Sequence, residues 1–491
     1  MARVLTDPGS RGELAPLTPP AGAVAFRFDE ALGLGGALEA LLPLLLTGQR
    51  AAGHRRNFGY PHPAADDAAV VADALVSGLN PQLALRREAP VAVALEDAVL
   101  RCVGTRLLGS PPAEAVFTSG GAEANFTAVV AALHHAFPQV QGGGLRGLGR
   151  APRVYASSAS HGSVRRAVRC AGLGDDALRL VPADRHGVMK IAALAAQVRA
   201  DRAAGGAPFL VVGTAGTTGL GAVDPLEPLA RLARKEGLWL HVDAAWGGLL
   251  AFGGRGDALA GIGDASSVCF DPHKALAQPL GTGALFTSVP GALTAAFRME
   301  AEYMPHGEAE PYARGLPWSR RFVGARLLFT LLARGMPALE RAAARQLAVG
   351  EHLKEALRSA GFLLRSETPM PVACFVDAGP RGQRGAHLRA LAAQVGMAGA
   401  GHLTLLRGHG PPMLRAAVHT TATDEAVVDE LVAALVSGRA ASSAARASSP
   451  APRASSSARG PEGEVDGRGF DGAGHGADER RGQHEVHEGD P

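Results

Sequence analysis

The sequence predicts an α/β protein whose central sheet is mostly parallel, followed by a smaller C-terminal α/β domain. Two observations favour this fold class. Between residues 115 and 286, short apolar runs alternate with helical segments, which is the order of strands and crossover helices in a parallel sheet. These runs end in loops of small residues that carry polar side chains, and ligands bind at the carboxyl ends of strands in open sheets of this kind.

Length and composition limit the class of protein. The chain has 491 residues, of which 47% are hydrophobic and 19% charged, with a formal net charge of +3, so it can bury a large core. Basic residues form no stripe interleaved with aromatics, which argues against nucleic acid as a partner. The four cysteines show no CxxC spacing, so we expect no disulfide framework and no metal site. With no apolar leader and no run of about 18 apolar residues, we expect a cytoplasmic protein without a membrane partner.

We expect four parts along the chain. Residues 1–80 form an N-terminal segment that is loosely held at its Pro- and Gly-rich start. Residues 81–325 form the large domain and residues 326–440 the small C-terminal domain. Residues 441–491 contain few large apolar side chains. They cannot offset the entropy cost of ordering, so we predict a disordered, low-complexity tail.

The first strand leads into a glycine turn. Residues 115–125 read as a strand, the turn Gly120-Gly121, and the start of a helix that continues to about residue 137. Glycines let the backbone approach a ligand closely, and the free N–H groups of a helix start attract phosphate. The turn lacks the GxxxxGK[ST] lysine of a P-loop and the GxGxxG pattern of a dinucleotide fold. It therefore predicts a phosphate site of another kind.

Three later strands bring polar residues to the same edge of the sheet. The further predicted strands span residues 153–156, 208–212, 238–243, 267–270 and 280–286. His161 follows the first of these. The run 238–243 is too apolar for a surface strand, which suits a buried parallel strand ending at Asp243. Lys274 follows the fourth, in an expected Pro-broken loop.

Helical periodicity also predicts which side chains pack inward. On the helix over 91–103 the expected packing face is formed by Leu95, Ala98, Val99, Cys102 and Val103. On the last helix the expected face is formed by Val427, Val428, Leu431 and Leu435. A helix over 226–236 ends at the cap residue Gly237.

Asp243 and Lys274 together meet the needs of one cofactor, pyridoxal 5′-phosphate (PLP). A lysine forms a Schiff base with the PLP aldehyde, and a buried carboxylate keeps the pyridine nitrogen protonated so that the ring accepts electrons. Either residue alone is ordinary in a soluble α/β protein, so this interpretation depends on the surrounding motifs.

The motifs resemble those of one enzyme family. Five motifs occur in the order and approximate spacing of the group II PLP-dependent amino-acid decarboxylases. They are residues 118–125, His161, and residues 216–218, 241–246 and 271–274. That family includes the aromatic-L-amino-acid, glutamate, cysteine-sulfinate and diaminobutyrate decarboxylases. The resemblance covers roughly residues 30–437. It implies the aspartate-aminotransferase-like fold (fold type I) and a homodimer, formed in part by the N-terminal segment, with active sites at the subunit interface.

The resemblance also implies roles for single residues. The implied catalytic residues are Lys274 as the Schiff-base lysine, Asp243 as the pyridinium partner, His161 as the imidazole stacked on the ring, and Tyr303 as a catalytic-loop tyrosine. The implied cofactor-binding residues are Gly121, Ala122, His161, Thr218, Asp243, Ala245, His273 and Lys274. The implied substrate pocket contains Phe58, Tyr60 and His62, which favours an aromatic or other apolar amino acid.

Three positions depart from the family pattern. Ala122 stands where a hydroxyl is usual, so one phosphate hydrogen bond must come from elsewhere. Asp271 stands where asparagine is common, and Ala275 follows the lysine where an aromatic residue often lies. None of the three touches the electron sink formed with Asp243.

The expected function is therefore that of a lyase of amino-acid metabolism. We expect a PLP-dependent carboxy-lyase that converts an L-amino acid to its amine and CO₂. The alternative is another fold type I PLP enzyme, such as an aminotransferase, an aldolase or an aldehyde-forming relative, because bond geometry and not the cofactor selects the bond that breaks. A nucleotide-binding module is disfavoured by the missing P-loop lysine.

Overall fold

The computed structural model describes residues 29, 31–47, 51, 53–299, 310–379, 384–408 and 410–447. By its contacts the chain separates into two units, residues 1–442 and 443–491. The first unit contains the sheets and the candidate site. Within the described residues, no helix has both the length and the apolar character needed to cross a membrane.

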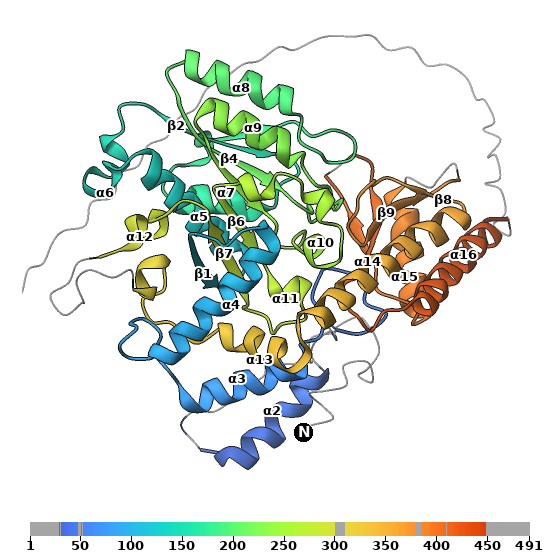
Figure 1. The fold of residues 1–491 in the computed structure, drawn as a ribbon. Helices are drawn as coiled ribbons and strands as arrows, with labels where there is room; N and C mark the ends of the chain where they lie inside the picture. The colour runs from blue at the N-terminus through green and yellow to red at the C-terminus, as the bar shows by residue number, and fades with distance from the viewer. Residues whose placement is uncertain are drawn as a thin grey trace, which may run out of the picture. The chain divides into compact units, whose positions relative to one another are not determined.

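The larger sheet has seven strands in the order β1-β7-β6-β5-β4-β2-β3. Figure 1 labels β1, β2, β4, β6 and β7 of this sheet, with helices around them. The strands of the sheet are β1 (Glu114–Thr118), β2 (Pro152–Ser157), β3 (Leu178–Val181), β4 (Ala207–Thr214), β5 (Trp239–Asp243), β6 (Ser267–Phe270) and β7 (Gly283–Thr287). Strands from β6 to β3 pair in parallel, whereas β7 is antiparallel to both β1 and β6. The predicted mostly parallel sheet is confirmed.

Helices cover both faces of this sheet, which explains why its strands are mostly apolar. Alternate strand residues such as Val211 and Val242 pack in a core with α4, α8 and α9, while Leu210 and Val212 pack in another core with α5 and α7. A strand buried on both faces reads as a nearly continuous run of apolar side chains. The helices of this part are α4 (Pro90–Leu108), α5 (Gly121–Ala136), α6 (Val140–Gly143), α7 (Gly162–Cys170), α8 (Ile191–Ala203), α9 (Leu226–Glu236), α10 (Leu249–Phe252), α11 (Pro272–Ala275) and α12 (Ala292–Phe297).

A second, four-stranded sheet follows in the order β10-β11-β9-β8, and all of its pairs are antiparallel. Its strands are β8 (Phe362–Leu364), β9 (Val372–Asp377), β10 (Thr404–Leu406) and β11 (Met413–Ala417), and its helices are α15 (Gly385–Met397) and α16 (Glu425–Ala447). The remaining helices are α2 (Gly33–Thr47), α3 (Asp67–Leu79), α13 (Gly324–Arg334) and α14 (Met336–Ser359).

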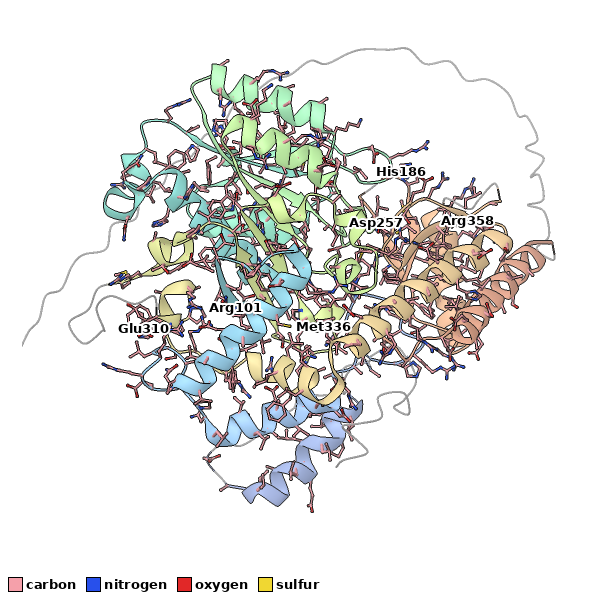
Figure 2. All side chains as sticks on the ribbon, viewed as in Figure 1. Arg101, His186, Asp257, Glu310, Met336 and Arg358 are labelled. Atoms are coloured by element: carbon pink, nitrogen blue, oxygen red, sulfur yellow. The ribbon has the colours of Figure 1, made fainter. Side chains whose placement is uncertain are left out.

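Helix α14 belongs to the cores of both sheets. Leu339 and Leu347 pack in the core of the larger sheet, whereas Leu353 and Leu357 pack in the core of the second sheet. Met336 and Arg358 mark its two ends (Figure 2). One continuous helix of 24 residues therefore joins the two halves of this unit.

Two local expectations need correction. Lys274 lies in the short helix α11, not in an open loop. On α4, Val99 and Val103 are buried as predicted, but Leu95, Ala98 and Cys102 are exposed. The buried face also contains Val93, Glu96, Leu100 and Leu107. Glu96 turns inward because its carboxylate pairs with Arg320, at 3.0 Å. On α16 the predicted inward face of valines and leucines is fully buried, as expected.

The predicted domain limits stay predictions. Helix α16 continues past residue 440 to Ala447, and the rest of the predicted tail lies outside the described residues.

Candidate active site

A cavity of about 230 Å³ lies where the strands of the larger sheet end. Side chains reach it from the segments after β1, β2 and β6 and from the last residues of β4 and β5. The residues predicted to bind the cofactor all line it, namely Gly121, Ala122, His161, Thr218, Asp243, Ala245, His273 and Lys274. Tyr303 lies outside the described residues.

The glycine turn before α5 forms one wall of the cavity. Gly120 has a φ of +149°, and a Cβ on Gly121 would lie 3.0 Å from the Cβ of Ala245 and 3.2 Å from Oδ2 of Asp271. A side chain at either position would therefore strain the backbone or crowd its neighbours. The first N–H groups of α5, which no intrahelical carbonyl accepts, open onto the space that the glycines leave. This arrangement suits an anion such as a phosphate.

Asp243 is a buried carboxylate held by three donors. Its Oδ2 accepts from Nδ2 of Asn125 at 2.9 Å, and its Oδ1 accepts from the N–H of Ala245 at 3.1 Å and from Sγ of Cys269 at 3.3 Å. Burial alone would raise the pKa of this carboxyl, but the hydrogen bond from Asn125 and the charge of Lys274 lower it overall. Asp243 is therefore ionised at the floor of the cavity.

A chain of buried hydrogen bonds supports Asn125. Nε1 of Trp239 donates to Oγ of Ser267, which lies 2.8 Å from Nδ1 of His241, and Nε2 of His241 lies 2.8 Å from Oδ1 of Asn125. Because an amide oxygen only accepts, Nε2 of His241 carries the hydrogen. Burial lowers the pKa of His241 to about 4, so its ring is neutral and its Nδ1 accepts from Ser267. In this series of hydrogen bonds, each residue therefore donates to the next one on the way to Asp243.

Lys274 lies opposite this floor and pairs with a second carboxylate. Its Nζ is 2.7 Å from Oδ2 of Asp271, which is fully buried. Burial tends to lower the pKa of Lys274, but the charge of Asp271 outweighs it and raises the pKa above its ordinary value. Without a bound aldehyde, Lys274 is therefore an ammonium at neutral pH.

His161 begins α7 and is oriented by Ser163. The N–H of Ser163 donates to Nδ1 of His161 at 3.2 Å, and Oγ of Ser163 lies 2.8 Å from the same nitrogen. Nδ2 of Asn125 also donates to that hydroxyl at 2.8 Å. The hydroxyl therefore donates to His161, so Nε2 carries the imidazole hydrogen on the side that faces the cavity.

The three residues predicted to form the substrate pocket are placed differently, and none lines this cavity. Phe58 is fully buried in the core of the second sheet. Tyr60 is 60% exposed, and its ring lies beneath the guanidinium of Arg415. The N–H of His62 donates to Nδ1 of His419 at 3.4 Å.

Arg415 is a candidate site residue that sequence reasoning missed. Its side chain is 1% exposed and lies over the rings of Tyr60 and Trp246, at 5.4 and 5.6 Å. Trp246 lines the cavity. Nε and Nη1 of Arg415 donate to the carbonyls of Gly219 and Gly59. Nη2 of Arg415 has no hydrogen-bond partner in the described part of the chain. In the sequence, β11 is an apolar strand with one arginine. Nothing in that pattern indicates that the arginine lies beside the cavity.

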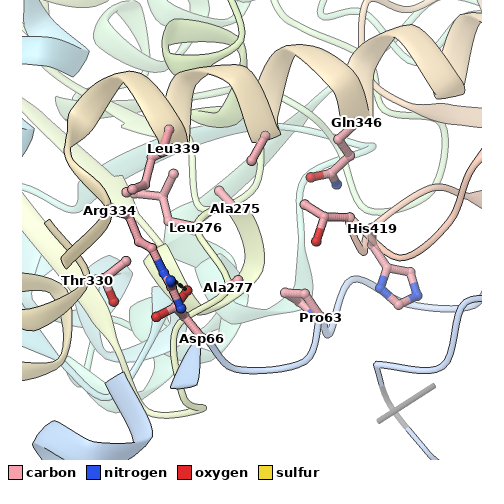
Figure 3. A pocket seen from close by; sticks show the side chains of 13 residues that line it. Pro63, Asp66, Ala275, Leu276, Ala277, Thr330, Arg334, Leu339, Gln346 and His419 are labelled. Carbon is pink, nitrogen blue, oxygen red and sulfur yellow. Dashed lines mark hydrogen bonds and ion pairs between the residues drawn. The ribbon is translucent and has the colours of Figure 1, made fainter. Parts of the chain in front are cut away.

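A second cavity, of about 190 Å³, borders Ala275, Leu276 and Ala277, the residues that follow Lys274 (Figure 3). Asp66 and Arg334 face each other across part of it and form an ion pair (Figure 3). Among the residues that the structure describes, no group of three or more His, Cys, Asp or Glu side chains could hold a metal ion.

Comparison with known proteins identifies the family. Residues 43–377 match the model of the pyridoxal-dependent decarboxylase conserved domain. The chain is 30% identical over 344 residues to L-2,4-diaminobutyrate decarboxylase of Rhizobium meliloti (strain 1021), a match covering 69% of this chain and 68% of that protein. It is 34% identical over 234 residues to human cysteine sulfinic acid decarboxylase, covering 48% of this chain and 47% of that one. The chain thus spans about half the length of the human relative.

A solved structure agrees in fold. The crystal structure of mouse CSAD superposes with a TM-score of 0.78 and 27% identity, covering 84% of this chain and 90% of that chain. This match and the observed sheet confirm the predicted α/β fold of type I.

The chain belongs to the pyridoxal-dependent decarboxylase family. Its class is that of PLP-dependent carboxy-lyases acting on amino acids, and its cofactor is PLP. The cavity fits that cofactor, because it combines an anion-binding helix start, a lysine amine and an ionised carboxylate among strand ends.

Proposed function

We propose that this protein holds PLP in the cavity at the strand ends and releases CO₂ from the Cα of an amino acid. The observation that carries the proposal is that Lys274 and the ionised Asp243 line one cavity with the glycine turn of α5. Bound PLP supplies an electron sink for the bond that breaks at Cα.

Each side chain then has a defined task. Lys274 anchors the aldehyde carbon. Asp243 keeps a proton on the ring nitrogen, because its three donors favour the ionised carboxylate. The start of α5 holds the phosphate, and we assign the hydroxyl missing at Ala122 to Ser119, which lines the cavity beside that turn. His161, held by Ser163, covers the ring.

We assign the carboxylate of the substrate to Arg415, which does not line the cavity itself but lies over Trp246, which does. Its Nη2 is buried and has no hydrogen-bond partner in the described residues, so a carboxylate oxygen there would satisfy a costly unpaired donor. The two relatives compared above are named for diaminobutyrate and cysteine sulfinate, which are short amino acids with a charged side chain. We therefore favour a short, polar amino acid as substrate. The preference for an aromatic or other apolar amino acid that was expected from Phe58, Tyr60 and His62 stays a prediction.

The proposed function is tested by measuring CO₂ release from a panel of amino acids that includes short acidic, short basic and aromatic members. Turnover of a short polar member and not of the aromatic ones supports the proposal. The Arg415→Met variant should raise KM for that substrate about tenfold or more, with a smaller change in kcat, because a binding contact is lost. Transfer of the amino group without CO₂ would favour the aminotransferase alternative.

After CO₂ leaves, Cα must receive a proton. We assign this step to the phenol of Tyr303, as the family resemblance implies. The Tyr303→Phe variant should then bind PLP normally and still release CO₂, but form amine slowly. An unchanged rate of amine formation would remove Tyr303 from the mechanism.

We also propose a homodimer. Helix α2 exposes a run of leucines, which favours a covered position against a second copy of the chain. These leucines are Leu34, Leu38, Leu41, Leu42, Leu44, Leu45 and Leu46. Light scattering of the purified chain, compared with a Leu38→Gln/Leu45→Gln variant, tests it: the variant should dissociate. A cytoplasmic location stays a prediction, which fractionation of the source cells would test.

A further inference from the structure

The ion pair between Asp271 and Lys274 has an unusual feature. Asp271 is fully buried, yet apart from the 2.7 Å contact with Nζ of Lys274, neither of its carboxylate oxygens has a hydrogen-bond partner among the described residues. Nε2 of His273 lies farther away, at 3.6 Å from Oδ2. Most buried carboxylates are stabilised by several donors, since an unsatisfied buried charge is costly.

Other buried carboxylates in this chain follow that rule. Asp243 has three donors, and Asp224 accepts from the N–H groups of Met189 and Thr214, both at 2.8 Å. Such hydrogen bonds satisfy the oxygens of a buried carboxylate. For Asp271 the amine of Lys274 is the one close donor among the described residues, so Lys274 is the group with which Asp271 can exchange a proton.

The surroundings hold the carboxyl group in place. A Cβ on Gly121 would lie 3.2 Å from Oδ2 of Asp271, and a Cβ on Gly283 would lie 2.8 Å from Oδ1. The carboxyl is therefore packed between the glycine turn of α5, the start of β7 and the amine of Lys274. The titratable groups that face it are Lys274 and His273 on α11 and Cys269 on β6.

We propose that Asp271 is a catalytic acid–base group that makes and breaks the covalent bond between Lys274 and the aldehyde carbon of PLP. This rests on the proposed role of Lys274. An ammonium has no lone pair and cannot attack a carbonyl. The ion-pair distance of 2.7 Å lets Nζ pass a proton directly to Oδ2.

The protons and electrons balance over the sequence. Nζ gives one proton to Asp271 and uses the freed lone pair to bond to the aldehyde carbon, while the C=O π electrons move to oxygen. That oxygen takes a second proton from Nζ and then the proton held by Asp271, and it leaves as water. The remaining lone pair on Nζ forms the C=N bond, which keeps one N–H and the positive charge. Asp271 returns to a carboxylate, and the reverse sequence frees Lys274.

An asparagine at this position could accept a hydrogen bond from Lys274 but could not accept its proton. We therefore expect Asp271 to affect the rate of covalent exchange at Lys274, not the existence of the bond.

The test uses the full chain freed of PLP, as wild type, Asp271→Asn and Asp271→Ser. The control is Glu351→Gln, which removes the carboxylate that pairs with Lys354; that pair has the same i,i+3 spacing and the same 2.7 Å distance. Covalent capture of PLP is followed across neutral pH by the visible absorbance and by mass spectrometry of the borohydride-reduced adduct on Lys274. Affinity for pyridoxine 5′-phosphate, which has no aldehyde, reports non-covalent binding.

We expect both Asp271 variants to capture PLP at least about tenfold more slowly, since acid–base catalysis typically contributes 10²–10⁴-fold. They should bind pyridoxine 5′-phosphate at least as tightly as wild type, and Glu351→Gln should match wild type in both assays. If Asp271 were only a counter-ion, its removal would lower the pKa of Lys274 and leave more free amine, so capture would be faster. Unchanged or faster capture would overturn the proposal.

The experiment distinguishes a failure of the Asp271 proposal from a failure of the proposed function. If Lys274 is not the covalent residue, wild type itself will show no reduced adduct there. Folding is checked by pyridoxine 5′-phosphate binding, and the Ser variant repeats the test if the Asn variant does not fold.

Discussion

Asp243 and Asp271 end neighbouring strands of one sheet and line one cavity, but they are built for opposite tasks. Asp243 accepts hydrogen bonds from Asn125 on α5, from Cys269 on β6 and from the N–H of Ala245. Among the described residues, Asp271 has the amine of Lys274 as its one close partner. Several donors favour the charged form of a carboxylate, whereas a single amine partner at 2.7 Å leaves a direct path for proton transfer. One cavity thus contains a carboxylate held by hydrogen bonds and a carboxylate paired with Lys274.

The largest expected effect comes from removing the amine that Asp271 serves. Lys274→Ala should abolish the covalent attachment of PLP and all turnover, because Lys190, Lys235 and Lys354 are the other lysines of the chain and none of them lines the cavity. Borohydride reduction followed by mass spectrometry measures the adduct. A reducible adduct of comparable yield in this variant would show that another residue binds the cofactor.

Asp243→Asn removes the negative charge of the carboxylate. We expect the variant to fold normally and to lose most of its activity. A neutral amide cannot hold the pyridine nitrogen protonated, and losing a buried partner charge changes a pKa by roughly 1–3. CO₂ release should therefore fall by roughly 10- to 1,000-fold. The ¹⁵N chemical shift of labelled PLP reports the nitrogen directly, and a protonated signal in the variant at neutral pH would contradict the assignment.

The third prediction concerns His241, which holds Asn125 in position. His241→Leu leaves Oδ1 of Asn125 without this donor, so we expect a loss of about 1–3 kcal/mol in the free energy of unfolding and roughly tenfold weaker PLP binding. His241→Gln has both a donor and an acceptor and should recover much of each. Equal PLP affinity in the Leu variant and wild type would separate the hydrogen-bond chain from Asp243.

His241 also makes the stability of the folded protein depend on pH, and the direction of that dependence can be predicted. The pKa of His241 is lowered from 6.5 to about 4 in the folded protein. The unfolded chain therefore binds the extra proton first, and stability is lost as pH falls from 6.5 toward 4. In the His241→Gln variant this part of the loss, on the order of 3 kcal/mol, should disappear. Denaturant unfolding of the two proteins at several pH values measures it.

The sequence predicts the charged residues of the site better than the hydrogen-bond partners of those residues. Asp243 and Lys274 follow apolar runs, and local motifs are sufficient to place both at strand ends. The role of Asn125 depends on a distance between segments that the sequence does not contain, since Asn125 meets a carboxylate 118 positions away. Arg415 was missed for the same reason, because nothing in β11 shows that its guanidinium lies beside Trp246.

Helix packing shows the same limit. The inward face of α16 was predicted correctly because it consists of aliphatic side chains in a helical repeat. The face of α4 was predicted only in part, because Glu96 is buried by its pairing with Arg320, 224 positions away. Hydrophobic periodicity assumes that charges face solvent, and a buried ion pair breaks that assumption.

The smallest expected effect comes from Cys269, the weakest of the three donors to Asp243. Its thiol lies 3.3 Å from Oδ1, and burial raises its pKa far above the ordinary value, so no second negative charge forms beside the carboxylate. Cys269→Ala removes the donor and should weaken PLP binding only a few-fold, because a thiol is a weak donor. Cys269→Ser replaces it with a stronger donor of similar size and should bind PLP at least as tightly as wild type.

Fluorescence titration of PLP into the two Cys269 variants decides this point. The buried Cys269 should also resist alkylation in the folded protein, whereas Cys102 and Cys170 are exposed and should react. If the Ala variant lost as much affinity as Asp243→Asn, the charge of Asp243 would depend on the thiol, and the contrast with Asp271 would be weaker. A loss of only a few-fold would mean that Asn125 and the backbone of Ala245 are sufficient to hold that charge.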